Sequence, residues 1–362
     1  MPGLTVYPPF PEDVPTAPLL IIDYALITAG DEHEKDRLFK AARELGFWYL
    51  KNHGADEEVD GMFDMGLETM RLPLQEKMKF EQGDGGLSFG YKAAGASTID
   101  EKGTRDANEF LNIAKDDVFA WPAVARRTYP ETVNARMTST IGPFIRKAVE
   151  VNTTLINALN DKLGLPEGTL AGVHRSDAHS ASASRFIRTA PEAYVSSEAK
   201  LLLPGHTDYG SLSFLHNRLG GLQVRMPVTD EWLYVKPLPG HAVCNVGDAL
   251  TIFSAGILRS NIHRVVPPPS EQKKYERHSL VYFTRPEDSV ILRPVEGSQL
   301  ISQEIAKNPE KNWDTSTTSK DWVARRISST RAKNYKSPEA WKAQARGTET
   351  DALFVRPAVN TN

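Results

Sequence analysis

The sequence predicts an α+β protein with a mainly β core, because its hydrophobic pattern changes character partway along the chain. In the N-terminal half, apolar residues recur mostly at helical spacing, whereas from Ser182 onward they gather in short runs separated by turn residues. These runs follow one another at spacings of roughly 10 residues without helices between them, which favours an antiparallel sandwich or barrel over a parallel sheet. After about Ile305 the chain becomes helical and polar again.

The N-terminal half begins with a strand-like stretch at residues 19–22, which an amphipathic helix follows. Asp31 has the side chain of an N-cap for this helix, and Gly46 is expected to end it. A strand is expected over residues 47–50, and the polar turn at 52–54 closes it.

Two further helices are expected in this half. One carries Val59, Phe63 and Met70 on its apolar face. The other is long and runs from about 130 to 163, and Pro143 should kink it or restart it.

The pattern of the C-terminal half predicts short strands with turns between them. The expected strands cover residues 184–187, 212–215, 222–225, 232–236, 242–246 and 279–283. Gly220-Gly221 and Pro239-Gly240 supply turns, and Asn245-Val246-Gly247-Asp248 is interpreted as a tight turn between barrel strands.

The composition excludes several classes of protein. The chain has 362 residues, with 43 Lys or Arg against 46 Asp or Glu and a formal net charge of −3, so nothing indicates a nucleic acid or an anionic membrane as partner. The single cysteine, Cys244, excludes an intrachain disulfide. Residues 1–18 lack the pattern of a signal peptide, and no apolar run reaches the roughly 18 residues of a membrane span. We therefore expect a cytoplasmic protein.

A histidine and a carboxylate lie two residues apart in the β-rich half. His206 and Asp208 form a His-Thr-Asp unit, and in an extended segment this spacing sends both side chains to the same face. His263 follows 55 residues after Asp208 in a strand-like context, so a returning antiparallel strand could bring it alongside. Two imidazoles and one carboxylate leave three positions open on octahedral iron, as in non-haem Fe(II) oxygenases.

A second pair of residues suits a small dicarboxylate. Arg277 and Ser279 also have the spacing that places both side chains on one face of a strand. Arginine can bind a carboxylate in a bidentate manner, serine can add a hydrogen bond, and the far end of the ligand can then reach the metal. The alternative is a surface strand with an exposed arginine.

Taken with other motifs, these residues resemble the isopenicillin N synthase-like branch of the Fe(II)- and 2-oxoglutarate-dependent dioxygenases. The matching motifs occur in the expected order over roughly residues 19–295. Besides the histidines, Asp208 and the Arg-x-Ser pair, they are Leu20-Ile21-Ile22-Asp23, Gly46-Phe47-Trp48-Tyr49-Leu50, Asn52-His53-Gly54, Leu72-Pro73-Leu74-Gln75-Glu76-Lys77, Gly90-Tyr91, Asn108-Glu109-Phe110, Gly220-Gly221-Leu222-Gln223-Val224 and Asn245-Val246-Gly247-Asp248.

The resemblance implies a double-stranded β-helix, or jelly roll, with flanking N-terminal, long central and C-terminal helices. It implies an N-terminal module over 1–125, the long helix and jelly-roll core over 126–304, and a C-terminal helical extension over 305–362, together forming one structural unit. Tryptophans of the extension are expected to dock it on the rest, namely Trp313, Trp322 and Trp341.

The resemblance also implies the site. His206, Asp208 and His263 would be catalytic as the ligands of Fe(II), and Arg277 and Ser279 would bind the distal carboxylate of the co-substrate 2-oxoglutarate. O₂ would be the oxidant.

The expected reaction is oxidation of an unactivated C–H bond in a small natural product of secondary metabolism, with release of succinate and CO₂. Hydroxylation is the simplest outcome, and desaturation or ring rearrangement can follow from the same hydrogen abstraction. Two alternatives stay open: an isopenicillin N synthase-type iron oxidase that does not use 2-oxoglutarate, and a catalytically silent relative that binds a small molecule. The oligomeric state is also open.

One stretch departs from the family pattern. Many relatives have an aromatic side chain that contacts the co-substrate, whereas this chain has Arg185-Phe186-Ile187-Arg188-Thr189. If Arg188 faces the barrel interior, it is a second cation near the iron that can bind 2-oxoglutarate or an acidic or phenolic substrate. The alternative is a salt bridge at the rim. Further substrate contacts are expected at the barrel mouth, from residues 87–98 and from Tyr209, Ser213, Tyr282 and Phe283, whereas His278 should pack on the opposite face from Arg277.

Overall fold

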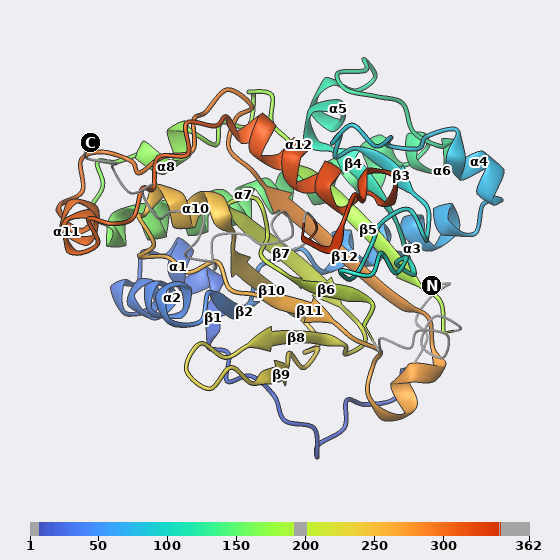
Figure 1. Cartoon of the computed structure of the whole chain (residues 1–362), viewed down its shortest axis with the longest axis horizontal. Coiled ribbons are helices and arrows are strands. Elements are labelled where there is room, and N and C mark those ends of the chain that lie inside the picture. The colour runs from blue at the N-terminus through green and yellow to red at the C-terminus, as the bar shows by residue number, and fades with distance from the viewer. Residues whose placement is uncertain (1–6, 192–200, 340, 342–362) are drawn as a thin grey trace.

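The computed structural model describes residues 7–191, 201–339 and 341, and two stacked β-sheets form its centre (Figure 1). The strands of the larger sheet are, in spatial order, β1 (Ile21–Asp23), β2 (Phe47–Lys51), β10 (His241–Val246), β7 (Leu212–Asn217), β12 (Arg277–Thr284), β5 (Ala183–Thr189), β4 (Asn108–Ala114) and β3 (Gly90–Lys92). Those of the smaller sheet are β6 (Leu203–His206), β11 (His263–Val265), β8 (Leu222–Arg225) and β9 (Trp232–Tyr234). Apart from the parallel pair β1–β2, neighbouring strands are antiparallel.

This architecture is the expected α+β jelly roll with flanking helices. The α-helices are α1 (Tyr24–Thr28), α2 (Glu32–Glu44), α3 (Asp56–Met70), α4 (Leu74–Met78), α5 (Lys115–Ala120), α6 (Glu131–Asn134), α7 (Gly142–Lys162), α8 (Thr169–Gly172), α10 (Asp248–Phe253), α11 (Gln299–Lys307) and α12 (Ser319–Thr330). In the described part of the chain, none of them combines the length and the hydropathy that a membrane crossing requires.

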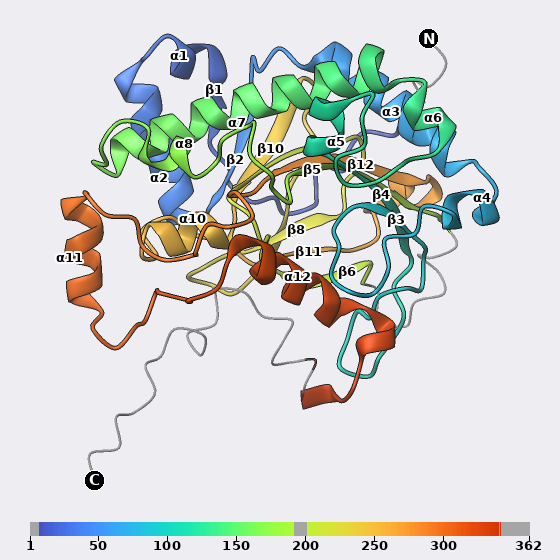
Figure 2. The same cartoon turned by 90° about the horizontal axis from the view of Figure 1, so that it is seen from above.

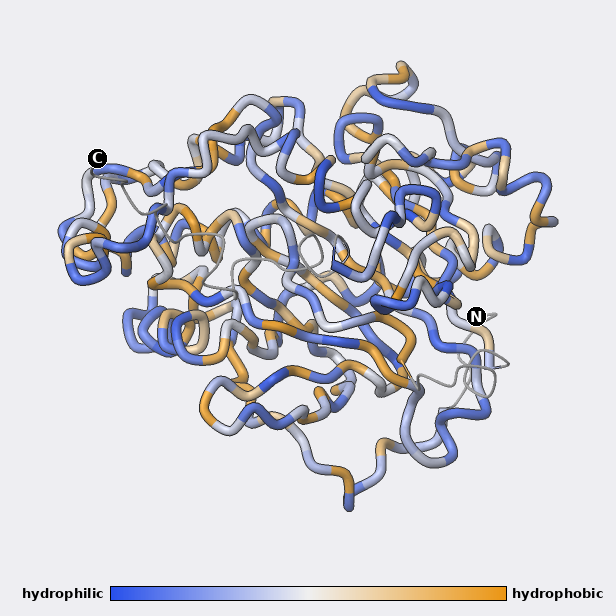
Figure 3. Tube along the Cα trace, in the orientation of Figure 1, coloured by the Kyte–Doolittle hydropathy of each residue, from blue (hydrophilic) through white to orange (hydrophobic). Residues whose placement is uncertain are grey.

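The predicted start and end of the first long helix are confirmed. The Asp31 carboxylate accepts a hydrogen bond from the Glu34 backbone N–H at 2.7 Å, which satisfies one of the free donors at the start of α2. After the helix, Gly46 has a φ of +74°, a conformation that favours glycine. Figure 3 shows α2 as largely hydrophilic, because only one of its faces packs inward.

Pro143 restarts the long helix, as the sequence predicts. A π-helical turn at Met137–Ile141 precedes α7, and Pro143 lies in the first turn of α7, where its missing N–H interrupts no hydrogen bond. Figure 2 shows α7 lying across one side of the sheets, with α12 on the opposite side.

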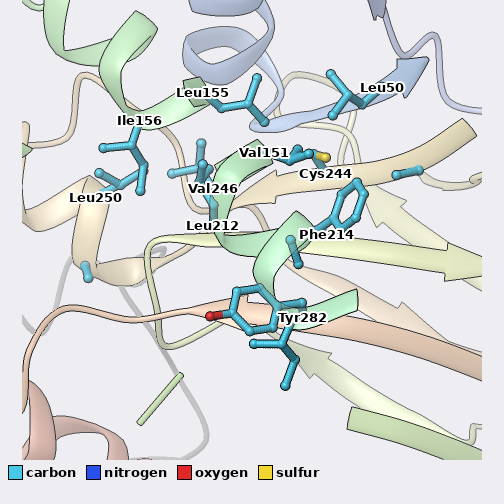
Figure 4. Close-up of a cluster of buried hydrophobic side chains, with 14 of the residues drawn as sticks. Leu50, Val151, Leu155, Ile156, Leu212, Phe214, Cys244, Val246, Leu250 and Tyr282 are labelled. Atoms are coloured by element: carbon cyan, nitrogen blue, oxygen red, sulfur yellow. The ribbon is translucent and has the colours of Figure 1, made fainter. Parts of the chain in front are cut away.

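The main core lies between α7 and the larger sheet. Val151, Leu155 and Ile156 of α7 are fully buried against the outward side chains of β7, β10 and β12 (Figure 4). These sheet residues are Leu212, Phe214, Cys244, Val246 and Tyr282. Residues two apart on each strand share this face, so their intervening neighbours face the smaller sheet.

The same buried cluster reaches both ends of the chain. It includes Leu50 near the N-terminus together with Trp313 and Trp322 of the C-terminal extension, so these two tryptophans dock as expected. The divisions at residues 125 and 304 stay a prediction.

Candidate active site

Strand pairing brings the predicted metal ligands together. Strands β6 and β11 are antiparallel neighbours, with His206 directly opposite His263, and their ring centroids are 4.3 Å apart. Asp208 lies just after β6, and its Oδ1 is 3.9 Å from His206 Nε2 and 3.8 Å from His263 Nε2. One ligand atom from each residue lies within 4.8 Å of the other two.

Hydrogen bonds orient all three side chains. The His206 Nδ1 lies 2.9 Å from the carbonyl oxygen of Pro204, and the His263 Nδ1 lies 3.2 Å from that of Asn261. Each contact fixes the tautomer that leaves Nε2 free to bind a metal ion.

The carboxylate of Asp208 is held in the same manner. Its Oδ2 accepts hydrogen bonds from the Ser213 hydroxyl at 2.6 Å and from the Asn245 amide at 2.8 Å, so Oδ1 is directed at the histidines.

The protonation states suit metal binding. Burial, with the neighbouring His263 as a second cause, lowers the pKa of His206 to about 3. Burial alone would raise the pKa of Asp208, but the two histidines and the hydrogen bonds from Ser213 and Asn245 outweigh it and lower that pKa to about 2. At neutral pH the site therefore offers a neutral imidazole and a carboxylate, the forms in which these groups bind metals.

Arg277 and Ser279 lie on β12 and, together with the three predicted ligands, line a cavity of about 90 Å³, which we call the inner cavity. Both are buried. The Arg277 guanidinium donates to the Gly220 carbonyl at 2.8 Å and to the Ser279 hydroxyl at 2.7 Å, and that hydroxyl donates to Asn217 Oδ1 at 2.7 Å.

This donor set fits the expected groups. Two imidazole nitrogens and one carboxylate oxygen suit Fe(II) and leave positions for other ligands. A buried arginine and a hydroxyl that line the same cavity suit the distal carboxylate of a dicarboxylate that reaches the metal.

A second cavity of about 130 Å³ extends from His206 and Asp208 toward α12, and we call it the outer cavity. Its wall includes residues of β5, the loop after β6, the end of β12 and α12. Tyr209 and Phe283 line it, as do Ser97 and Thr98 from the predicted segment 87–98 and Trp341 from the C-terminal extension.

Arg188 does not face the interior, so of its two alternatives the role of a second cation near the iron is wrong. In the register of β5 with β12, Arg188 lies opposite His278, whereas Ile187 lies opposite the inward Ser279. Arg188 instead pairs with Glu109 at 2.7 Å and with Glu276. The alternative of a salt bridge at the rim is therefore the one that the structure supports.

Of the other candidates for substrate contact, Tyr282 is also misplaced. Tyr282 is 1% exposed and lies in the core beneath α7, because it alternates with the inward Val281 and Phe283. Ser213 does line the inner cavity, but its hydroxyl is engaged with Asp208.

The stretch interpreted as a tight turn has a different structure. Asn245 belongs to β10 and donates to Asp208, while Gly247 precedes α10, which begins at Asp248.

Sequence reasoning also missed residues that line the site. Arg185 and Ile187 of β5 border both cavities, and Asn217 of β7 borders the inner one. The register of the strands places Asn217 and Ile187 at the site. Both residues lie directly opposite Ser279, one on each side of β12. This register cannot be read from one strand alone.

Two family models match the chain. Residues 180–286 match the 2OG-Fe(II) oxygenase superfamily, and residues 19–132 match the N-terminal region named non-haem dioxygenase in morphine synthesis. The chain is also 30% identical over 293 residues to the 2-oxoglutarate-dependent dioxygenase frbH of Dothideomycetidae sp., a match that covers 79% of this chain and 87% of that relative.

Solved structures share the fold. A full-length Neurospora crassa protein in complex with α-KG superposes with a TM-score of 0.70 at 21% identity, covering 85% of this chain and 95% of the other. JOX2 in complex with 2OG, Fe and JA gives a TM-score of 0.65 at 22% identity, covering 94% and 92%.

Proposed function

Because this chain belongs to the 2-oxoglutarate-dependent Fe(II) dioxygenases, whose cofactors are Fe(II) and 2-oxoglutarate, we propose that it hydroxylates an unactivated C–H bond of a small natural product. In this reaction O₂ supplies one oxygen atom to the substrate and one to succinate, and 2-oxoglutarate loses CO₂. The observation that carries the proposal is the convergence of one ligand atom each from His206, Asp208 and His263 within 4.8 Å, on the cavity that Arg277 lines.

In this proposal the three converging residues are the catalytic metal ligands. His206 and His263 would each bind Fe(II) through Nε2, while the carbonyls of Pro204 and Asn261 hold their Nδ1 protons. Asp208 would bind through Oδ1, since Oδ2 already accepts two hydrogen bonds.

Arg277 and Ser279 would bind the co-substrate. Their buried donors match the distal carboxylate, and Asn217 holds the serine hydroxyl in place. Arg277 is fixed in turn by the Gly220 carbonyl, so the guanidinium is already oriented before the co-substrate arrives.

Bound Fe(II), 2-oxoglutarate and O₂ supply the oxidising chemistry, and the protein supplies orientation and a dry surrounding. The apolar side chains of Ile187, Leu215 and Phe283 line the inner cavity and exclude water from it. The outer cavity would admit the substrate, with Tyr209 and Phe283 in its wall.

A direct test is to incubate the purified full-length chain with Fe(II), 2-oxoglutarate and candidate substrates, and to quantify succinate by mass spectrometry. We expect succinate to form in the wild type and to be lost in Asp208→Ala. O₂ uptake that does not depend on 2-oxoglutarate would favour the oxidase alternative. Failure to bind Fe(II) would favour the silent binding protein.

A further inference from the structure

Five lysine and arginine side chains of the described residues line the outer cavity; four of them are buried, and Arg185 is partly exposed. They are Lys92, Arg185, Arg285, Arg326 and Arg331. Three of these are ion-paired. Lys92 pairs with Asp106, Arg326 pairs with Asp248 at 2.6 Å, and Arg331 pairs with Glu81 at 2.6 Å and Asp84 at 2.7 Å.

Arg185 has no such ion pair within the described part of the chain, and other contacts hold it in place. Its Nε donates to Asn112 Oδ1 at 2.7 Å, and its guanidinium lies 4.2 Å from the ring centroid of Phe110 and 5.1 Å from that of Phe283. Among the described residues, the groups that attract its charge are Tyr209 and Asp208, and neither is at ion-pair distance.

Arg285 also lies close to the ring of Phe283. Its guanidinium is 4.9 Å from the ring centroid of Phe283, its Nη1 donates to the Ala181 carbonyl, and its Nε has no hydrogen-bond partner among the described residues. Burial and the nearby charge of Arg185 lower its pKa to about 10. The guanidinium groups of Arg185 and Arg285 therefore both contribute positive charge to the outer cavity.

The balance of charges around the two cavities indicates that an anionic ligand is needed in the outer cavity. The two charges of a ferrous ion and the charge of Arg277 are matched by Asp208 and the two carboxylates of 2-oxoglutarate. Among the described residues no carboxylate pairs with Arg185 or Arg285, and an uncompensated charge in a desolvated cavity is costly. An anionic ligand in the outer cavity would compensate the charges of both arginines.

We propose that Arg185 and Arg285 bind the carboxylate of an acidic substrate, whose apolar part packs on Phe110, Ile187 and Phe283. This proposal rests on the proposed function, and it defines the substrate class of the same site. Arginine suits the role because its planar donors match a carboxylate.

The test is a binding measurement in the absence of O₂. The full-length chain is loaded with Fe(II) and 2-oxoglutarate, and isothermal calorimetry measures the affinity of phenylalkanoates and naphthylalkanoates with one to four methylene groups. Each acid is compared with its uncharged amide. We expect at least one acid to bind about 10-fold or more tightly than its amide, since hydrogen bonds to charged groups are strong.

Single variants assign the preference to the two arginines. Arg185→Met and Arg285→Met should each weaken binding of that acid by about 10-fold or more and leave binding of its amide and of 2-oxoglutarate unchanged. Arg185→Lys should retain part of the preference. Arg188→Met is the matched control, because Arg188 lies on the opposite face of the same strand, and it should bind the acid as the wild type does.

Several outcomes would overturn the inference: equal affinity for acids and amides, no binding by any acid of the panel, or unchanged preference in both methionine variants. Loss of 2-oxoglutarate binding in Arg185→Met would assign Arg185 to the co-substrate instead. Failure of the wild type to bind Fe(II) and 2-oxoglutarate would contradict the proposed function, and this is detected before any acid is added.

Discussion

Arg326 of α12 donates to the carboxylate of Asp248 at the start of α10, with 2.6 Å between Nη1 and Oδ2, and both side chains are almost fully buried. The other terminal nitrogen of Arg326 lies 3.3 Å from the carbonyl oxygen of Thr207, the residue between His206 and Asp208. The C-terminal extension is thereby joined to the segment that carries two of the proposed metal ligands.

We expect Arg326→Met to lower the free energy of unfolding by about 3 kcal/mol, because it removes the cation beside a buried carboxylate. Thermal or urea unfolding measures the change. The double variant Arg326→Met/Asp248→Asn should recover part of the loss. If the single variant is as stable as the wild type, the pair does not contribute to stability as we infer.

The hydrogen bond from Asn245 to Asp208 should matter for metal binding. Asn245→Ala removes a donor that orients the carboxylate, and such a change typically weakens metal affinity by about 10-fold to 100-fold. Titration with Fe(II) without O₂, or with Mn(II), measures it. Asn160→Ala is the control, because Asn160 caps backbone groups near the end of α7, and it should change stability but not metal affinity.

Arg277→Met should raise the KM for 2-oxoglutarate by about 10-fold or more, because a charged donor to the distal carboxylate is lost. Steady-state kinetics with varied 2-oxoglutarate measures this. Arg264→Met is a matched control: Arg264 lies on β11 beside His263, but its guanidinium stacks 4.2 Å from the Trp232 ring. An unchanged KM in Arg277→Met would exclude the proposed role.

The pH dependence of stability should include a contribution from His278. Burial lowers the pKa of His278 to about 4, below the ordinary histidine value of 6.5. Between these two values the unfolded chain binds a proton that the folded chain does not, so stability falls as the pH decreases through this range. The full effect is about 3 kcal/mol.

His278→Phe keeps a ring that can stack on Phe186 and removes the titration. Unfolding measured from pH 7 to pH 4 should therefore show a smaller loss of stability in this variant than in the wild type. Parallel curves for the two proteins would contradict the interpretation.

The sequence was sufficient where local chemistry decides the structure. Asp31 and Pro143 mark helix starts because an N-cap side chain and a proline act within one turn. All six strands expected in the C-terminal half are present, as β5, β7, β8, β9, β10 and β12, because turn residues separate the apolar runs. The spacing of His206 and Asp208 predicted that both side chains reach one site, and they do, although β6 ends at His206 and Asp208 lies just beyond it.

Other features depend on pairing between distant strands. The register of β5 with β12 decides whether Arg188 or Ile187 faces inward. The alternation of side chains along β5 shows only that neighbouring residues face opposite sides, and not which of the two faces the interior. Strand β4 was missed because its polar residues, such as Asn108 and Asn112, find partners only in the folded protein. The helix after Gly247 was missed because a glycine followed by aspartate also suits a turn.

The direct opposition of His206 and His263 limits where this protein can change its length. Strand β6 has four residues and β11 has three, so neither can absorb an insertion or deletion away from the histidine it carries. Shifting either strand by one position would turn its imidazole to the other face and separate it from Asp208. The connection between β8 and β9 is free of this constraint. We therefore expect insertions and deletions to be tolerated between β8 and β9 and to be selected against beside the two histidines.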